Sequence, residues 1–292
     1  MKIDTILITG ATGYLGNALI PELLKRYAPR SLRIFGRSES KLVDLLRRYG
    51  DMDHDRLRAL VGDVRDEDRI RSAVRDVDLV IHAAALKRLE VCNYSPEEAI
   101  KTNVQGSLNV LKACMEFKPA KAVFISSDKA VRPTNLYGMT KAIMEEAVLQ
   151  TARFNGIGTP KLAVCRYGNV IGSTGAAIPY FIQQIRAGKP ITITHKDMTR
   201  FLLTRRDAVK IVCRAIEGDD RLILPLGLRA IPLLKAVCYI GHHFGSEVPI
   251  SFTHPESGEK LHEEIEVDRF SNEAPEVSEA DFIAMLKEEG LL

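Results

Sequence analysis

Apolar residues in the first half of the chain fall into short runs that alternate with longer amphipathic stretches. The short runs are rich in β-branched residues and nearly continuous in apolar side chains, which is typical of strands buried on both faces of a sheet. The predicted strands are residues 5–9, 32–35, 57–61, 78–82, 122–126 and 161–166. The predicted helices between them are residues 15–27, 39–49, 66–74, 96–116 and 137–154.

This alternation predicts an α/β fold built on a doubly wound parallel Rossmann sheet. Right-handed crossovers place the carboxyl ends of all strands at one edge, where ligands bind. After Arg166 the alternation stops and glycine and proline become frequent. We therefore expect a smaller C-terminal α/β lobe that binds the substrate. The expected division assigns residues 1–167 plus about 201–225 to the dinucleotide domain, and residues 168–200 and 226–292 to the substrate lobe.

Composition narrows the function classes. The 292 residues are 46% hydrophobic with a net charge of +3, and basic residues are scattered, so no nucleic-acid footprint is expected. The five dispersed cysteines favour reduced thiols in a cytoplasmic protein. The N-terminus reads directly as a strand, and no apolar run approaches the ~20 residues that a membrane span requires. We expect no membrane segment and, because no three ligands have metal-binding spacing, no metal.

A glycine-rich motif follows the first predicted strand and opens a helix. Its glycines allow a tight turn and a close backbone approach to a pyrophosphate, and the helix N-terminus adds partial positive charge. This context predicts dinucleotide binding rather than a turn alone. The motif residues expected to contact the cofactor are Gly10, Thr12, Gly13, Tyr14, Leu15 and Gly16.

The residues after the second and third strands bear on the choice of dinucleotide. No acidic residue follows the second strand to accept from a ribose 2′-hydroxyl; Arg37 and Ser38 stand there instead. Both could bind a 2′-phosphate, so NADP is favoured over NAD, with a solvated Arg37 as the alternative. Asp63, followed by Val64, either accepts from the adenine amine or caps the next helix.

Tyr137 and Lys141 have the i, i+4 spacing that places a phenol and an ammonium on one helix face. The lysine and the nicotinamide charge would favour the phenolate, which then accepts a hydroxyl proton. Preceded by Ser127 and by the glycine motif, this pair resembles the extended short-chain dehydrogenase/reductase superfamily over nearly the whole chain. That resemblance extends to the stretch beginning at His82 and to Asn103. It implies cofactor contacts from Ala83, Ala84, Ala85, Asn103, Tyr137 and Lys141.

Asp128 and Lys129 are an acid and an amine that a simple dehydrogenase or epimerase does not need. A sugar 4,6-dehydratase does: oxidation at C4 acidifies the C5 proton, a base removes it, an acid protonates the departing 6-hydroxyl, and hydride returns to C6. Lys129 would be the base, with its pKa lowered by burial and by Lys141, and Asp128 the desolvated acid. The alternative is a pair that only caps the strand end.

The motif from Ser127 to Lys129, followed by Tyr137-Gly138 and Lys141, is similar to that of the configuration-inverting UDP-N-acetylglucosamine 4,6-dehydratases of flagellin-sugar and polysaccharide biosynthesis. Further stretches agree: 83–87, 166–172, 197–201 and 258–263. The resemblance implies an NADP-dependent lyase that inverts C5 and assembles as a homo-oligomer. It also implies substrate contacts from Lys87 near the sugar, Asn169 and Arg200 at the UDP diphosphate, and Glu259 at the uridine ribose.

One departure keeps the substrate open. The family commonly has an arginine shortly before the glycine at position 258, and here none precedes it; His254 or Arg200 could replace that contact. Three alternatives therefore remain. The chain could be a nucleotide-sugar 4-epimerase or a reductase of the same superfamily, or a non-catalytic NADP-sensing protein.

Overall fold

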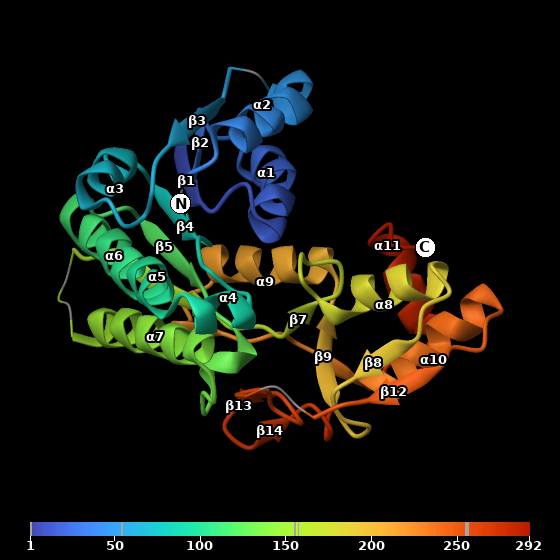
Figure 1. Cartoon of the computed structure of the whole chain (residues 1–292). Helices are drawn as coiled ribbons and strands as arrows, with labels where there is room; N and C mark the ends of the chain where they lie inside the picture. Colours follow the sequence, from blue (N-terminus) through green and yellow to red (C-terminus); the bar gives the residue numbers. More distant parts are fainter. Residues whose placement is uncertain (1, 54, 155, 157, 255–256) are drawn as a thin grey trace.

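The computed structural model describes residues 2–53, 55–154, 156, 158–254 and 257–292. Within this part of the chain, seven parallel strands form one sheet in the order β10-β6-β5-β4-β1-β2-β3 (Figure 1). The strands are β1 (Thr5–Thr9), β2 (Ser31–Gly36), β3 (Leu57–Val61), β4 (Leu79–His82), β5 (Lys121–Ile125), β6 (Lys161–Cys165) and β10 (Leu222–Ile223).

Helices cover both faces of this sheet. On one face the core includes α1 (Tyr14–Tyr27), α2 (Glu39–Asp53) and α9 (Arg205–Glu217), and on the other α3 (Glu67–Val74), α6 (Gly106–Phe117) and α7 (Leu136–Phe154). Successive strand residues alternate between the two cores: Ile6 and Ile8 pack on the first face and Leu7 on the second. The hydrophobic runs are continuous because both faces of the sheet are buried. The predicted doubly wound α/β fold is confirmed.

The long helix predicted over residues 96–116 is the main local error. The structure has α5 (Pro96–Ile100), a π-helical turn η1 (Lys101–Gln105) and then α6, and a short helix α4 (Leu89–Tyr94) precedes them. In the π turn the Asn103 side chain donates to the Leu86 carbonyl at 2.8 Å and to the Thr140 hydroxyl at 3.0 Å. The hydrophobic periodicity of the sequence does not reveal these polar contacts. π turns often occur at functional sites.

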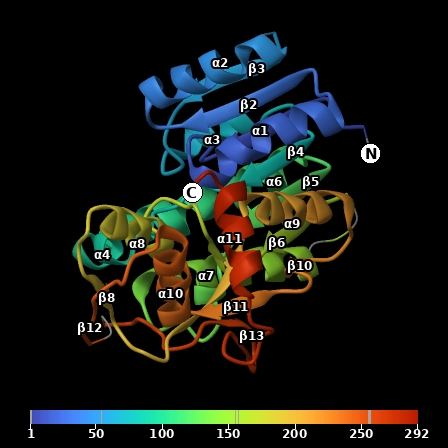
Figure 2. The same ribbon diagram turned by 90° about the vertical axis from the view of Figure 1, so that its right-hand side faces the viewer.

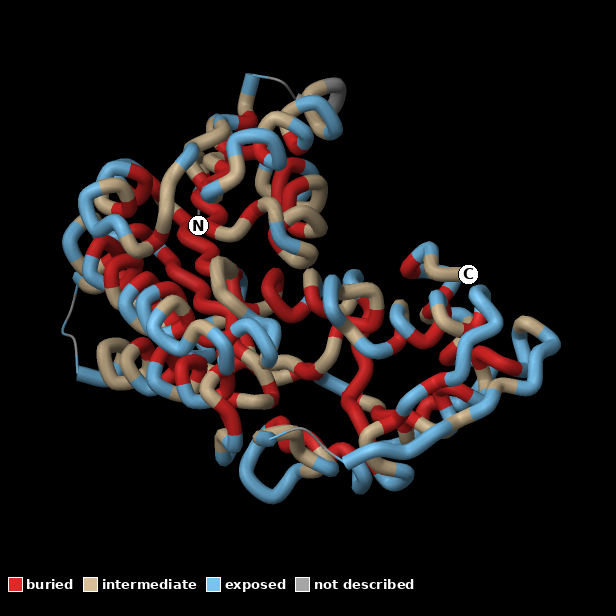
Figure 3. The backbone as a smooth tube through the Cα atoms, viewed as in Figure 1, coloured by how far each residue is buried: buried red, intermediate tan, exposed pale blue. Residues whose placement is uncertain are grey.

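The second lobe contains short strands and helices around its own core (Figures 2 and 3). In the described residues, its strands pair as β11-β9-β7, β12-β8 and β13-β14. They are β7 (Asn169–Val170), β8 (Ile191–Ile193), β9 (Thr199–Leu203), β11 (Arg229–Pro232), β12 (Ile250–Phe252), β13 (Glu264–Glu266) and β14 (Arg269–Phe270). The helices are α8 (Ala177–Arg186), α10 (Leu233–Phe244) and α11 (Glu279–Glu288).

The residue after α11 joins the second lobe to the glycine-rich turn. Glu289 is buried and accepts hydrogen bonds from the Tyr14 hydroxyl and from the Arg205 backbone amide. The Arg205 guanidinium pairs with the same carboxylate at 3.5 Å and lies over the Tyr14 ring. Three segments far apart in the sequence therefore meet beside the start of α1.

Candidate active site

A cavity lies where the glycine-rich turn faces the ends of β2, β3 and β4. Gly10 has a positive φ of 70°, and a Cβ there would lie 2.6 Å from the Ala84 nitrogen. A side chain at Gly10 would therefore prevent the turn from packing against the backbone that follows β4. The predicted cofactor residues that line the cavity are Gly10, Thr12, Gly13, Arg37, Asp63, Val64, Ala83, Ala84 and Ala85.

The remaining predicted residues of the nucleotide site do not line this cavity in the described part of the chain. The Tyr14 hydroxyl donates to Glu289, and the Asn103 side chain donates to the Leu86 carbonyl. The Ser38 hydroxyl lies 3.0 Å from that of Ser40. Leu15 packs against the core, and a Cβ on Gly16 would lie 2.4 Å from the Gly10 carbonyl oxygen. Contacts from these residues to a cofactor remain predictions.

Thr102, the neighbour of Asn103 in the sequence, lines the cavity from the π turn. Its hydroxyl is buried and has no hydrogen-bond partner among the described residues. A buried polar atom without a partner is rare in folded proteins. The cavity thus presents an unused hydroxyl as well as glycine backbone, and these features fit a bound dinucleotide.

Asp63 is engaged by a neighbouring arginine. Its carboxylate accepts from the Arg65 backbone amide at 3.0 Å and from the Arg65 guanidinium at 2.6 Å. Burial by itself raises the pKa of Asp63, but the hydrogen bonds from Arg65 outweigh burial and hold the pKa below its usual range. The alternative that Asp63 caps the next helix is wrong, because Asp66 is the N-cap of α3.

The reacting side chains are expected on the turn after β5 and on α7. A 3₁₀ turn, η2 (Asp128–Ala130), follows β5, and Ser127 caps it by accepting from the Lys129 amide. A Cβ on Gly138 would lie 2.2 Å from the Lys129 carbonyl oxygen, so only glycine allows α7 to approach this turn. The approach positions Tyr137 within hydrogen-bonding reach of the Ser127 hydroxyl.

Asp128 is fully buried. One carboxylate oxygen accepts from the Ser127 hydroxyl at 2.9 Å and from the Lys129 amine at 3.3 Å. The other, Oδ2, has no partner in the part of the chain that the structure describes. Burial raises the pKa of Asp128, and the Glu263 carboxylate adds to the increase while Lys129 opposes it. The expectation of a desolvated carboxyl is confirmed.

The Lys129 amine contacts three oxygens: Glu263 Oε1 at 2.7 Å, and Asp128 Oδ1 and Asn169 Oδ1 at 3.3 Å each. Burial by itself lowers the pKa of Lys129, but the two carboxylates outweigh burial and raise the pKa above its usual range. The expectation that burial and Lys141 lower this pKa is wrong. The opposing cation is Arg200.

Tyr137 and Lys141 lie on the same face of α7 and are both buried. Burial raises the pKa of Tyr137 to about 12, against the opposing effects of the Lys129 cation and the Ser127 hydrogen bond. Burial lowers the pKa of Lys141 to about 8, and its amine donates to the Ile125 carbonyl at 2.7 Å. The cation that favours the phenolate here is therefore Lys129, where Lys141 was expected.

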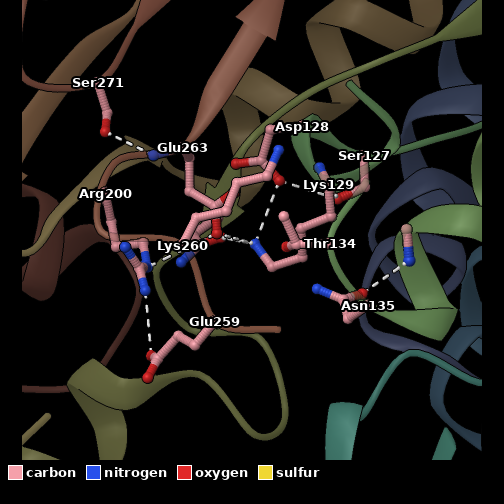
Figure 4. Close-up of polar contacts among 12 residues, drawn as sticks. Ser127, Asp128, Lys129, Thr134, Asn135, Arg200, Glu259, Lys260, Glu263 and Ser271 are labelled. Carbon is pink, nitrogen blue, oxygen red and sulfur yellow. Dashed lines mark hydrogen bonds and ion pairs between the residues drawn. The ribbon is translucent and has the colours of Figure 1, made fainter. Parts of the chain in front are cut away.

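The second lobe brings charged side chains to the same place (Figure 4). Arg200, on β9, is buried and lies 3.1 Å from Glu259 and 3.8 Å from Glu263. Glu259 and Glu263 each keep one buried oxygen without a partner among the described residues. The donors of Arg200 are thus already directed at protein groups, and its contact with a diphosphate remains a prediction.

Lys87 is exposed, and no hydrogen bond or ion pair links it to this cluster within the described ranges. Glu263 was missed by sequence reasoning. It closes the 258–263 stretch that supported the family resemblance, so its place in that motif was the available signal.

In the described residues, no helix is both long enough and apolar enough to cross a bilayer, and no cluster of three metal-ligating side chains occurs. His82 is a buried histidine bonded to Thr9 and Ser107, with its pKa lowered to about 3 by burial. It is therefore neutral and fully satisfied.

The parallel sheet, the glycine-lined cavity and the Tyr137/Lys141 pair define an extended short-chain dehydrogenase/reductase fold. Within that class, residues 6–284 match the polysaccharide biosynthesis protein family, and the chain belongs to this family.

Individual relatives span most of the chain. The UDP-glucose 4-epimerase of Rickettsia typhi is 41% identical over 273 residues, 91% of this chain and 78% of the relative. An uncharacterized membrane protein of Methanocaldococcus jannaschii is 37% identical over 272 residues, 90% of this chain and 80% of the relative. Among solved structures, Pen from Bacillus thuringiensis has a TM-score of 0.91 and 29% identity, and the match covers 100% of this chain and 99% of that one.

The close approach at Gly138 generates a stability prediction. Gly138→Ala must push the Lys129 carbonyl away, and overpacking of this kind costs about 1–3 kcal/mol. Urea denaturation should show this loss in the free energy of unfolding. The control is Met139→Ala on the same helix, whose side chain is 45% exposed and whose loss should change stability by less than about 0.5 kcal/mol. Equal stability of the two variants would contradict the steric argument.

Proposed function

We propose that this protein is an NADP-dependent dehydratase that converts UDP-N-acetylglucosamine to a UDP-4-keto-6-deoxy-N-acetylhexosamine with inversion at C5. The observation that carries the proposal is the adjacent pair of Asp128, which is fully buried, and Lys129, whose side chain is 18% exposed, with Asp128 Oδ2 unpartnered among the described residues and Tyr137 nearby. A carboxyl kept protonated by burial can donate to a leaving hydroxyl, and an adjacent amine can accept a carbon-bound proton.

Each side chain then has a defined proton to move. The nicotinamide cofactor, when bound, accepts hydride from sugar C4 and returns it to C6. Tyr137 accepts the proton of the C4 hydroxyl, and the Lys129 cation and the Ser127 hydrogen bond lower the barrier to its ionisation. Lys129 accepts the C5 proton. Asp128 donates its proton to the C6 oxygen, which leaves as water, so the reaction causes no net oxidation of the sugar.

The second candidate is a nucleotide-sugar 4-epimerase. The names of the Rickettsia relatives favour it. Epimerisation needs Tyr137 and the cofactor but gives no task to Asp128 or Lys129. The placement of this largely desolvated pair near the phenol supports the dehydratase, because a charged pair that is removed from water and has no role carries a desolvation cost.

The product distinguishes the two candidates. Purified protein incubated with UDP-N-acetylglucosamine in deuterated water should form a product lighter by one water, with a 4-keto group and deuterium at C5, measured by mass spectrometry and NMR. A mass-neutral UDP-N-acetylgalactosamine would establish the epimerase. Turnover of no nucleotide sugar by cofactor-loaded protein would favour an NADP-sensing role.

Replacement of the proposed base separates the steps of the reaction. Lys129→Ala should reduce dehydration by about 10²- to 10⁴-fold, the usual contribution of general acid–base catalysis, while NADP affinity stays unchanged. The measurement is product formation alongside cofactor titration by fluorescence. Tyr137→Phe is the comparison variant, since it should also abolish oxidation at C4. Near-normal dehydration by Lys129→Ala would remove Lys129 from the mechanism.

The cofactor assignment depends on Arg37, an exposed residue that lines the dinucleotide cavity. If Arg37 binds the 2′-phosphate, Arg37→Ala should weaken NADP binding by about 10- to 100-fold, the value of a charge-assisted hydrogen bond, and leave NAD binding nearly unchanged. Calorimetric titration with both dinucleotides measures this difference. Equal losses for the two cofactors would contradict the assignment.

A further inference from the structure

Glu263 is a buried carboxylate that the proposed reaction has not yet used. It lies at the end of the loop before β13, its side chain is 2% exposed, and its backbone amide donates to the Ser271 hydroxyl at 2.9 Å. Its Oε1 lies 2.7 Å from the Lys129 amine and 3.8 Å from Arg200 Nε. Figure 4 shows the Glu263 and Asp128 carboxylates both reaching the Lys129 amine.

The charges around Glu263 come from three segments. Asp128 and Lys129 approach from η2, Arg200 from β9, and Glu259 and Lys260 from the same loop as Glu263. The Lys260 amine donates to the Val131 carbonyl, and its charge also acts on Glu263 and Asp128. Lys129, Arg200 and Lys260 therefore face Glu259, Glu263 and Asp128, and of these carboxylates Asp128 is the most deeply buried.

A fully buried carboxylate is most stable when it carries a proton. Burial raises the pKa of Asp128 and the Glu263 charge raises it further, whereas the Lys129 and Arg200 cations keep the pKa of Glu263 below its usual range despite burial. The environment therefore separates two carboxyl groups that flank one amine. Such separation is the usual way in which one site holds both an acid and a base.

We propose that Glu263 is a positioning residue: it holds the Lys129 amine beside Asp128, and its charge keeps the proton on Asp128 for the leaving hydroxyl. This inference rests on the proposed dehydratase function. It assigns a role in proton transfer to a residue contributed by the second lobe.

The proton transfers balance over one cycle. In the working state Asp128 carries the proton and Lys129 is neutral. The amine accepts the proton of sugar C5, and Asp128 gives its proton to the C6 oxygen, which leaves as water. Transfer from the Lys129 amine to Asp128 over their 3.3 Å contact then restores the starting state. The proton that Tyr137 took from the C4 hydroxyl passes to solvent, and solvent supplies a proton to C5 when hydride reaches C6.

Glu263→Gln tests this role because the amide keeps the size of the side chain and removes its charge and basicity. The variant should bind NADP normally and lower kcat by about 10- to 100-fold, below the full effect of a catalytic group. The alkaline limb of its kcat profile should also move to lower pH. The sign follows from Asp128: without the Glu263 charge its pKa falls, so the acid loses its proton at lower pH.

Two further variants control for a purely structural effect. Glu264→Gln alters the next residue, which is equally buried but pairs with Arg132 at 3.2 Å, outside the cluster; it should keep the wild-type kcat and profile. Glu263→Asp keeps the charge at a longer distance and should show an intermediate kcat with the alkaline limb close to wild type. A Glu263→Gln enzyme with wild-type kcat and an unmoved alkaline limb would overturn the inference.

An infrared titration of the resting protein gives the same answer without turnover. The protonated Asp128 carboxyl, identified by its loss in Asp128→Asn, should ionise at lower pH in Glu263→Gln than in wild type. If Glu263→Gln does not fold, Glu263→Asp provides the test. A wild-type kcat in Glu263→Asp, or an alkaline limb that moves to higher pH, would contradict the role. A wild-type protein that forms no 4-keto product would refute the dehydratase function separately, and unchanged Asp128 ionisation would refute the coupling of the two carboxyl groups.

Discussion

The ion pair between Lys129 and Glu263 joins the two lobes at the centre of the candidate site. Lys129 is 18% exposed and Glu263 2% exposed, so the pair is largely removed from water. Buried pairs of this kind rarely increase stability over apolar residues, because desolvation offsets the attraction between the charges. The protein nevertheless surrounds the pair with Asp128, Arg200 and Glu259. A cluster with this cost is more readily understood as machinery for moving protons than as a means of holding the lobes together.

The sheet supplies the other half of the arrangement. Because its strands are parallel, the ends of β1, β2 and β4 meet at one edge around the cofactor cavity, and the turn after β5 begins at the same edge. Gly138 then lets α7 contact that turn. The cofactor cavity and the side chains proposed for acid–base chemistry are thus positioned by neighbouring strands of one sheet, while the second lobe contributes the charges of Arg200, Glu259 and Glu263.

Much of this organisation could be read from the sequence, and the reasons are local. The strand positions followed from continuous apolar runs, and the glycine motif followed from its place between β1 and α1. What could not be read depends on contacts between distant segments. Glu263 is 134 residues away from Lys129 along the chain, so no spacing rule links them, and the pKa of Lys129 was misjudged because its second carboxylate was unknown. The π turn at Asn103 could not be predicted from the sequence for the same reason, because its polar partners lie on other elements.

The contact between Tyr14 and Glu289 has a mechanical consequence for a redox-neutral catalyst. Tyr14 starts the helix that follows the dinucleotide turn, and Glu289 extends from the C-terminal helix of the opposite lobe. Separation of the lobes would break the contact between Tyr14 and Glu289 and disturb the glycine-rich turn next to Tyr14. Opening for sugar exchange and loosening of the dinucleotide would then be linked motions. An enzyme that returns hydride from its cofactor to the sugar in every cycle would keep the reduced cofactor bound only while the contact between Tyr14 and Glu289 is intact.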